Sequence, residues 1–190
     1  ANPAHCEGFI VGDPGFDQAE FGNIESLKAL ISETTAAIVI EPVQGEGGIT
    51  VASRKFLKAV RDLCDSNDIL LMFDEVQCGI ARTGSLYAYE QLGVSPDLLA
   101  SAKGLGGGFP IGACLAVEKV AVALAPGSHG STFGGNPLAT AVGNAVLDEL
   151  IDDTFLISVR DMGAYFKKEL ELLVERFPTL LPEVRGLGLM

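Results

Sequence analysis

Four short apolar runs, separated by segments with helical spacing, constrain the fold of this chain more than any other feature. The runs are AAIVI (36–40), ILLMF (69–73), DLLASA (97–102) and GACLAV (112–117). Strands that are covered on both faces have continuous rather than alternating apolar runs, and they occur mainly in parallel sheets flanked by helices. The sequence therefore predicts an α/β domain with a mostly parallel sheet and helices on both faces.

Helix start signals lie between these runs. Asn23, Ser53 and Asn136 are good N-cap residues, and Pro137 takes the first helical position after the last of them. Apolar residues at helical spacing follow Asn23 as far as Ile31 and also follow Ser53. A shorter helix is predicted within SLYAYEQLG (85–93), and a long amphipathic helix over about 154–177.

Composition excludes several classes of function. The chain has 25 acidic and 13 basic residues and a formal charge of -12, without a basic stripe, so nucleic acid and anionic membranes are poor partners. Neither the cysteines (Cys6, Cys64, Cys78, Cys114) nor the histidines (His5, His129) have metal-ligand or disulfide-framework spacing. No run approaches the ~20 apolar residues of a membrane span. We therefore expect a cytoplasmic protein without a bound metal.

Charged residues follow three of the predicted strands. Glu41, Asp74 and Lys103 come directly after the first three runs. The carboxyl ends of parallel strands meet at one edge of the sheet, where ligands bind in such folds. Charges at strand ends are often only solvated or paired, but a lysine here can form a Schiff base and an aspartate can hold a protonated pyridine nitrogen. That pair of groups suits pyridoxal phosphate.

Two segments rich in small residues complete the candidate site. In KGLGGG (103–108) the glycines predict an irregular stretch in which the backbone passes close beneath a ligand, with positive φ angles. This stretch matches neither G-x-G-x-x-G nor the P-loop pattern, which weakens a nucleotide-binding interpretation. In HGSTFGGNP (129–137), the hydroxyls of Ser131 and Thr132 lie just ahead of a helix start and can bind a phosphate.

The strings EPVQGEGG, FDEVQCGIARTG, AKGLGGGFPIGA and HGSTFGGNPLA, in this order, resemble the class III pyridoxal-phosphate aminotransferases of fold type I. Within that family they are most similar to the acetylornithine aminotransferases, and the resemblance covers nearly all 190 residues. It implies that residues 1–152 are part of the large cofactor-binding domain. Residues 153–190 would be a long helix and the start of the small C-terminal domain.

The resemblance also implies a role for each matching residue. Lys103 would form the internal aldimine and move a proton between the substrate α-carbon and the cofactor. Asp74 would bind the pyridinium nitrogen, Gln77 would contact the 3-hydroxyl group and Val76 would pack on the ring face. Glu41 would have a supporting role near the ring.

Further implications concern substrates and assembly. Glu46 would pair with an active-site arginine and release it for 2-oxoglutarate, while Ser131 and Thr132 would reach the phosphate bound by the neighbouring subunit of a homodimer. The implied reaction converts N2-acetylornithine and 2-oxoglutarate into N-acetylglutamate 5-semialdehyde and glutamate, a step of arginine biosynthesis.

Several alternatives stay open at this point. Ornithine, succinylornithine and 4-aminobutyrate aminotransferases share most of these strings, and aminomutases and decarboxylases share the fold. A noncatalytic α/β module that binds a phosphorylated metabolite, or a structural remnant that binds neither, is a possibility from another class. Members of the family are longer than this chain and have further cofactor- and substrate-binding segments on both sides, so we expect the isolated fragment to be inactive or nearly so.

Overall fold

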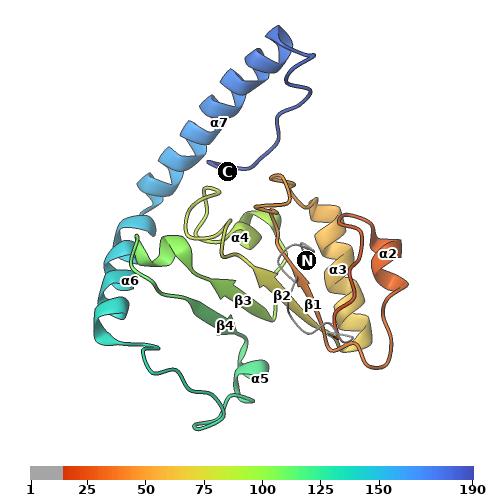
Figure 1. The fold of residues 1–190 in the computed structure, drawn as a ribbon, viewed down its shortest axis with the longest axis vertical. Helices are drawn as coiled ribbons and strands as arrows, with labels where there is room; N and C mark the ends of the chain where they lie inside the picture. Colours follow the sequence, from red (N-terminus) through yellow and green to blue (C-terminus); the bar gives the residue numbers. More distant parts are fainter. Residues whose placement is uncertain (1–14) are drawn as a thin grey trace, which may run out of the picture.

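A computed structural model describes residues 15–190, so that His5 and Cys6 lie outside the described residues. Its sheet has the order β1-β2-β3-β4, in which β1, β2 and β3 are parallel and β4 is antiparallel to β3 (Figure 1). The strands are β1 (Ala37–Ile40), β2 (Leu70–Asp74), β3 (Leu98–Ser101) and β4 (Ala113–Ala116). The predicted mostly parallel α/β sheet is confirmed, and each strand begins and ends within one residue of its apolar run.

The helices lie between the strands and after them. They are α2 (Ile24–Lys28), α3 (Arg54–Asn67), α4 (Ala88–Leu92), α5 (Glu118–Ala121), α6 (Pro137–Leu150) and α7 (Asp153–Arg176), with a 3₁₀ turn, η1 (Lys103–Gly106). All three predicted N-caps are observed: the Ser53 side chain, for example, accepts a hydrogen bond from the Phe56 N–H group at 3.1 Å. Helix α2 is shorter than predicted, because the chain leaves the helix at Ala29 although apolar spacing continues to Ile31.

Helix α3 covers one face of the sheet. Leu57 and Val60 of α3 and Leu71 and Phe73 of β2 belong to one cluster, and each has a fully buried side chain. Burying a side chain of this size contributes about 1.5–3 kcal/mol, so this layer holds β2 firmly in place. The opposite face of the sheet is more open, since Val39 of β1 is 54% exposed.

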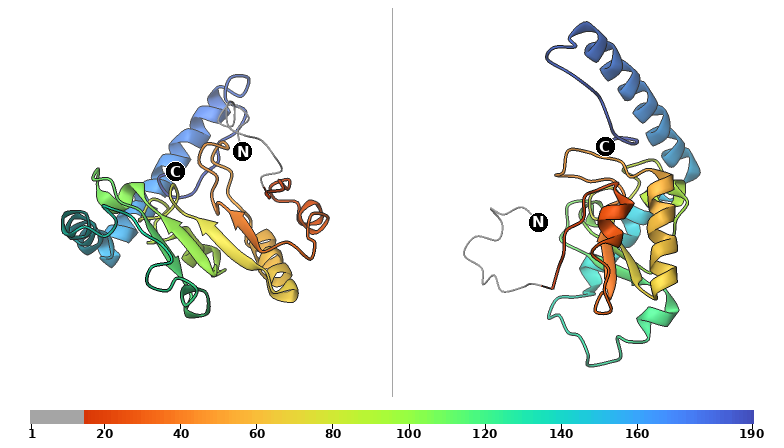
Figure 2. Two further views of the ribbon diagram at one scale, coloured as in Figure 1. Left: turned by 60° about the horizontal axis from the view of Figure 1, so that its bottom comes forward. Right: turned by 90° about the vertical axis from the view of Figure 1, so that its right-hand side faces the viewer.

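Helix α7 extends away from the sheet, and the segment after it runs back toward the sheet (Figures 1 and 2). The returning segment makes a backbone hydrogen bond of 3.0 Å from Leu189 to Arg82, and Leu187 and Met190 pack against the main core. The predicted domain boundary falls at Asp152, the N-cap residue of α7. The division into two domains stays a prediction.

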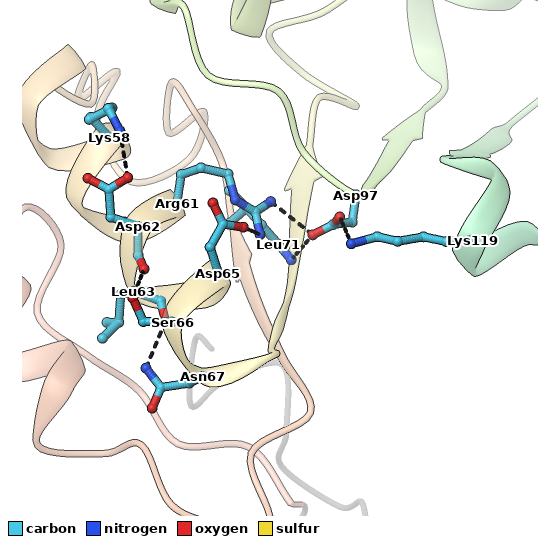
Figure 3. Close-up of polar contacts among 10 residues, drawn as sticks. All are labelled: Lys58, Arg61, Asp62, Leu63, Asp65, Ser66, Asn67, Leu71, Asp97 and Lys119. Atoms are coloured by element: carbon cyan, nitrogen blue, oxygen red, sulfur yellow. Dashed lines mark hydrogen bonds and ion pairs between the residues drawn. The ribbon is translucent and has the colours of Figure 1, made fainter.

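Asp97 joins four elements at the amino end of β3 (Figure 3). Its carboxylate accepts hydrogen bonds from Leu71 N of β2 at 2.9 Å and from Arg61 of α3 at 2.8 Å, and it pairs with Lys119 Nζ of α5 at 3.1 Å. Burial alone would raise the pKa of Asp97, but these donors outweigh burial and hold the pKa below its ordinary value of 3.8. The ionised carboxylate therefore stabilises the fold.

We expect Asp97→Asn to lower the free energy of unfolding by about 2 kcal/mol at neutral pH, since a charged acceptor of several hydrogen bonds is lost. The loss stays near this value because Arg61 keeps a second partner, Asp65, at 2.7 Å. Since the folded-state pKa is lowered, the contribution of Asp97 is complete above the unfolded-state value and is lost as pH falls below about 4.

Urea unfolding of both proteins across this pH range measures the effect. The exposed pair Lys58–Asp62 gives the control, because Asp62→Asn removes a surface ion pair and should cost less than about 1 kcal/mol. A difference between wild type and Asp97→Asn that stays constant into acid would contradict the assignment.

Candidate active site

Asp74 and Lys103 lie at the same edge of the sheet, as the strand pattern predicts. Asp74 is the last residue of β2 and pairs in register with Ala100 of the adjacent parallel strand, three residues ahead of Lys103. The half-buried Asp74 carboxylate accepts a hydrogen bond of 3.0 Å from the Val76 N–H group. This bond fixes the carboxylate at the start of the turn that follows β2.

Lys103 begins the 3₁₀ turn η1, one residue after the end of β3. The prediction that the glycine-rich stretch forms no regular element is wrong for Lys103–Gly106, because Leu105 is buried and anchors a short helical turn. Lys103 has a φ of 47°, which is uncommon for a residue with a side chain and is typical of functional sites. The exposed side chain extends toward the β2 turn, where Nζ donates a hydrogen bond to Gln77 Oε1.

The glycines of this turn permit close packing beneath Lys103. A Cβ at Gly104 would lie 3.2 Å from Ile80, and a Cβ at Gly107 would lie 2.9 Å from Val146 of α6. Gly107 also has a φ of 53°. The predicted positive φ is confirmed at Gly107 and Gly108. The close approach of this backbone to a ligand stays a prediction.

The loop after β1 also reaches the site. The Glu41 carboxylate accepts a hydrogen bond of 2.9 Å from the Gly45 N–H group, which closes the loop on itself. Gly45 lies directly against Gln77: a Cβ at this position would come within 2.8 Å of Gln77 Cγ. Glu46, the next residue, is exposed to solvent. Three loops that follow three parallel strands therefore meet around Gln77.

Ser131 and Thr132 belong to a different region of the chain. Because β4 is antiparallel, it begins beside Ser101 and ends beside Leu98, so the segment after β4 leaves from the end of the sheet opposite Lys103. Both hydroxyl residues are exposed, and Ser131 Oγ accepts a hydrogen bond of 3.0 Å from the Gly134 N–H group. The structure does not place them beside Lys103 of the same chain.

Glu75 is the residue of this region to which the sequence analysis gave no role. Its side chain is fully buried and accepts hydrogen bonds from the backbone N–H groups of Ala88 (2.6 Å) and Tyr89 (2.8 Å). Burial raises the pKa of Glu75 to about 7, while the bonds from Tyr89, Ala88 and Cys78 act in the opposite direction. The available signal was the acidic pair at the end of β2: neighbouring strand residues face opposite ways, so one of the two must point inward.

The donor set fits a planar pyridine aldehyde. Lys103 offers an amine, Asp74 a carboxylate for a ring nitrogen, Gln77 an amide and Val76 an apolar contact surface. Asp74 ends β2, Val76 and Gln77 lie on the turn that follows it, and Lys103 lies on the turn that follows β3. The hydrogen bond between Lys103 and Gln77 joins the two turns. The site residues assigned from the sequence stay predictions, but their arrangement is compatible with pyridoxal phosphate.

Comparison with known proteins gives a consistent result. The family described as Aminotransferase class-III matches residues 12–190. The acetylornithine aminotransferase of Agrobacterium fabrum is 54% identical over 98% of this chain and 47% of its own length. The acetylornithine aminotransferase of Methanocaldococcus jannaschii is also 54% identical, over 99% of this chain and 47% of its own length.

Solved structures agree with these relatives. The N-acetylornithine aminotransferase from Stenotrophomonas maltophilia superposes with a TM-score of 0.82 at 41% identity, over 95% of this chain and 47% of that one. An ornithine aminotransferase from Toxoplasma gondii, crystallised with partial occupancy of pyridoxal phosphate, gives a TM-score of 0.89 at 38% identity. The match covers 96% of this chain and 44% of that chain. The chain spans about half the length of the relatives that it matches.

Proposed function

This chain belongs to the class III aminotransferases, which use pyridoxal phosphate, and we propose that the protein containing it transfers an amino group from N2-acetylornithine to 2-oxoglutarate. The products are N-acetylglutamate 5-semialdehyde and glutamate, as in arginine biosynthesis. The observation that carries the proposal is the placement of Asp74 and Lys103 at the carboxyl ends of adjacent parallel strands, with Gln77 Oε1 accepting a hydrogen bond from the lysine Nζ.

When it is bound, pyridoxal phosphate supplies an electron sink for the bonds of the substrate α-carbon. Lys103 Nζ would hold the aldehyde carbon of the cofactor and would move a proton at the substrate α-carbon. Asp74 would supply the negative charge that favours a protonated ring nitrogen. Gln77 orients Nζ through its side-chain oxygen.

The other predicted residues have supporting roles in this proposal. Glu46 pairs with an active-site arginine while the amino donor is bound and releases it for 2-oxoglutarate. Its side chain is exposed in the loop after β1, so it is accessible to such a partner. Glu41 shapes that loop through its bond to Gly45. Ser131 and Thr132 serve the phosphate of the neighbouring subunit in a homodimer, which agrees with the course of the chain, since it leaves β4 at the end of the sheet opposite Lys103.

The choice of acetylornithine is supported by the names of relatives with 48–54% identity. Ornithine aminotransferases superpose equally well, at 38% identity for the Toxoplasma gondii protein, so the fold does not separate the two donors. We also propose a cytoplasmic location; within residues 15–190 no helix is both long enough and apolar enough to cross a membrane. A polypeptide limited to these 190 residues is proposed to be inactive or nearly so, since it covers under half of its relatives.

The proposal is tested by reductive trapping in the full-length protein that contains this chain. Incubation with pyridoxal phosphate and reduction with borohydride should add the cofactor mass to the proteolytic peptide that carries Lys103. Lys103→Ala should lose this addition, whereas Lys58→Ala, a change at an exposed lysine of α3, should keep it. Turnover is then compared among N2-acetylornithine, ornithine and 4-aminobutyrate.

The outcomes separate the candidate functions. Trapping at Lys103 with fastest turnover of N2-acetylornithine supports the proposal, and fastest turnover of another donor assigns the protein to another member of the same family. Reversible phosphate binding that is unaffected by Lys103→Ala would favour the noncatalytic binding module instead.

A further inference from the structure

Glu75 connects the turn that bears the proposed cofactor-binding residues to the start of α4. Helix α4 has no side-chain cap of its own, because its N-cap residue, Tyr87, makes no capping hydrogen bond. The Glu75 carboxylate takes that role from 13 residues away, with Oε2 accepting from Ala88 at 2.6 Å and Oε1 accepting from Tyr89 at 2.8 Å. Cys78 Sγ, within the same turn, donates to Oε2 at 3.7 Å.

The backbone of Glu75 is equally constrained. Its N–H group donates to the Ala100 carbonyl of β3 at 3.0 Å, and its carbonyl accepts from Gly79 at 2.9 Å. Ala100 is three residues ahead of Lys103. One residue therefore links the end of β2, the end of β3 and the start of α4.

The functional side chains of the turn lie directly around Glu75. Asp74 precedes it and Val76 and Gln77 follow it, and Gln77 binds the Lys103 Nζ. Asp74 is half buried and Gln77 is exposed, whereas Glu75 points into the protein with no exposed surface. A movement of Glu75 would therefore displace Asp74 and Gln77 relative to Lys103.

The side-chain contacts of Glu75 require a carboxylate. All three partners are donors, and they are divided between both oxygens. A glutamine would place an N–H group against a backbone N–H group at one of these positions, which leaves a buried donor without an acceptor. An apolar residue would leave both backbone N–H groups of α4 unpaired.

We propose that Glu75 is a positioning residue for the reaction: by binding the start of α4, it holds Asp74 and Gln77 at a fixed place relative to Lys103. The proposal rests on the proposed aminotransferase function. It goes further by assigning the alignment of the site to a residue that has no surface for contact with a cofactor or substrate.

The test is Glu75→Gln in the full-length protein, with three measurements. Amide hydrogen exchange in peptides covering 74–79 and 87–90 should become about tenfold faster, as the loss of one hydrogen bond predicts. The pH at which the absorbance of the bound cofactor changes should shift by about 0.5 or more. The value of kcat should fall about 10- to 100-fold, since small misplacements in a site have effects of this size.

Asp97→Asn is the matched control, because it also removes a buried carboxylate beside β3, but at the end of the strand opposite Lys103. It should lower stability without changing the absorbance profile or kcat. If Glu75→Gln does not fold, Cys78→Ala must show faster exchange at 74–79, since it removes only one donor to Glu75.

The outcomes also distinguish the two proposals. A wild-type protein that never attaches pyridoxal phosphate to Lys103 overturns the proposed function, while exchange at 74–79 still tests the positioning of the turn. Unchanged exchange at 74–79, or an unchanged absorbance profile and kcat in a folded Glu75→Gln protein, overturns the positioning role.

Discussion

Replacing Lys103 by arginine should lower kcat/KM of the full-length protein by about 10³-fold or more, with the fold retained. Arginine keeps the charge and can still donate to Gln77 Oε1, so the contact between the two turns survives. The guanidinium group stays protonated at any working pH, however, and can neither attack an aldehyde carbon nor accept a proton from a substrate. Positioned acid–base groups alone contribute about 10²- to 10⁴-fold.

The measurement is steady-state kinetics with N2-acetylornithine and 2-oxoglutarate, together with a thermal melt. Lys58→Arg changes an exposed lysine of α3 in the same way and should leave both values close to wild type. Activity of the Lys103→Arg protein within tenfold of wild type would show that another group carries the chemistry.

Much of the fold was predictable because the signals are local. Ser53 and Asn136 cap α3 and α6 as expected, since an N-cap needs only its own side chain and a neighbouring N–H group. The apolar runs located the strands because β2 and β3 are buried or half-buried along their whole length, although β1 and β4 have exposed residues. The location of Asp74 and Lys103 at one edge of the sheet was predictable, because the carboxyl ends of parallel strands lie at the same edge.

The remaining features depend on contacts between distant segments. The segment GACLAV did not predict that β4 is antiparallel to β3, because an apolar run does not indicate how a strand is oriented relative to its neighbour. The turn at Lys103–Gly106 forms because Leu105 packs in a cluster with Ile80, Tyr87 and Leu99, which outweighs the low helical preference of its glycines.

Buried polar residues were the least predictable part of the structure. Glu75 belongs to an acidic pair of a kind that usually faces solvent, and Asp97 opens an apolar run. Apart from Cys78, the side-chain and backbone partners of these two carboxylates lie 13 to 36 residues away. No local sequence pattern predicts that the carboxylate of Glu75 accepts hydrogen bonds from the first N–H groups of α4. Only the alternation of side chains at the end of β2 indicates that Asp74 and Glu75 must point in opposite directions.

Asp74→Asn should lower kcat by about 10²- to 10³-fold with a smaller effect on KM. Asparagine has the same shape, and its side-chain oxygen can still accept the hydrogen bond from Val76, so the turn after β2 is preserved. What is lost is the negative charge at a half-buried position, which keeps the ring nitrogen of the cofactor protonated in the proposed mechanism. Removal of one preorganised electrostatic contact in an active site commonly has an effect of this size.

Steady-state kinetics and unfolding of Asp74→Asn and Asp97→Asn distinguish the effect of the Asp74 charge on catalysis from the effect of the Asp97 charge on stability. The two aspartates lie at opposite ends of adjacent strands, Asp74 at the carboxyl end of β2 and Asp97 at the amino end of β3. Asp97→Asn should therefore lower stability and leave kcat unchanged, whereas Asp74→Asn should do the reverse. Equal losses of kcat in both variants would mean that Asp74 acts through stability, and the role of its charge at the ring nitrogen would have to be abandoned.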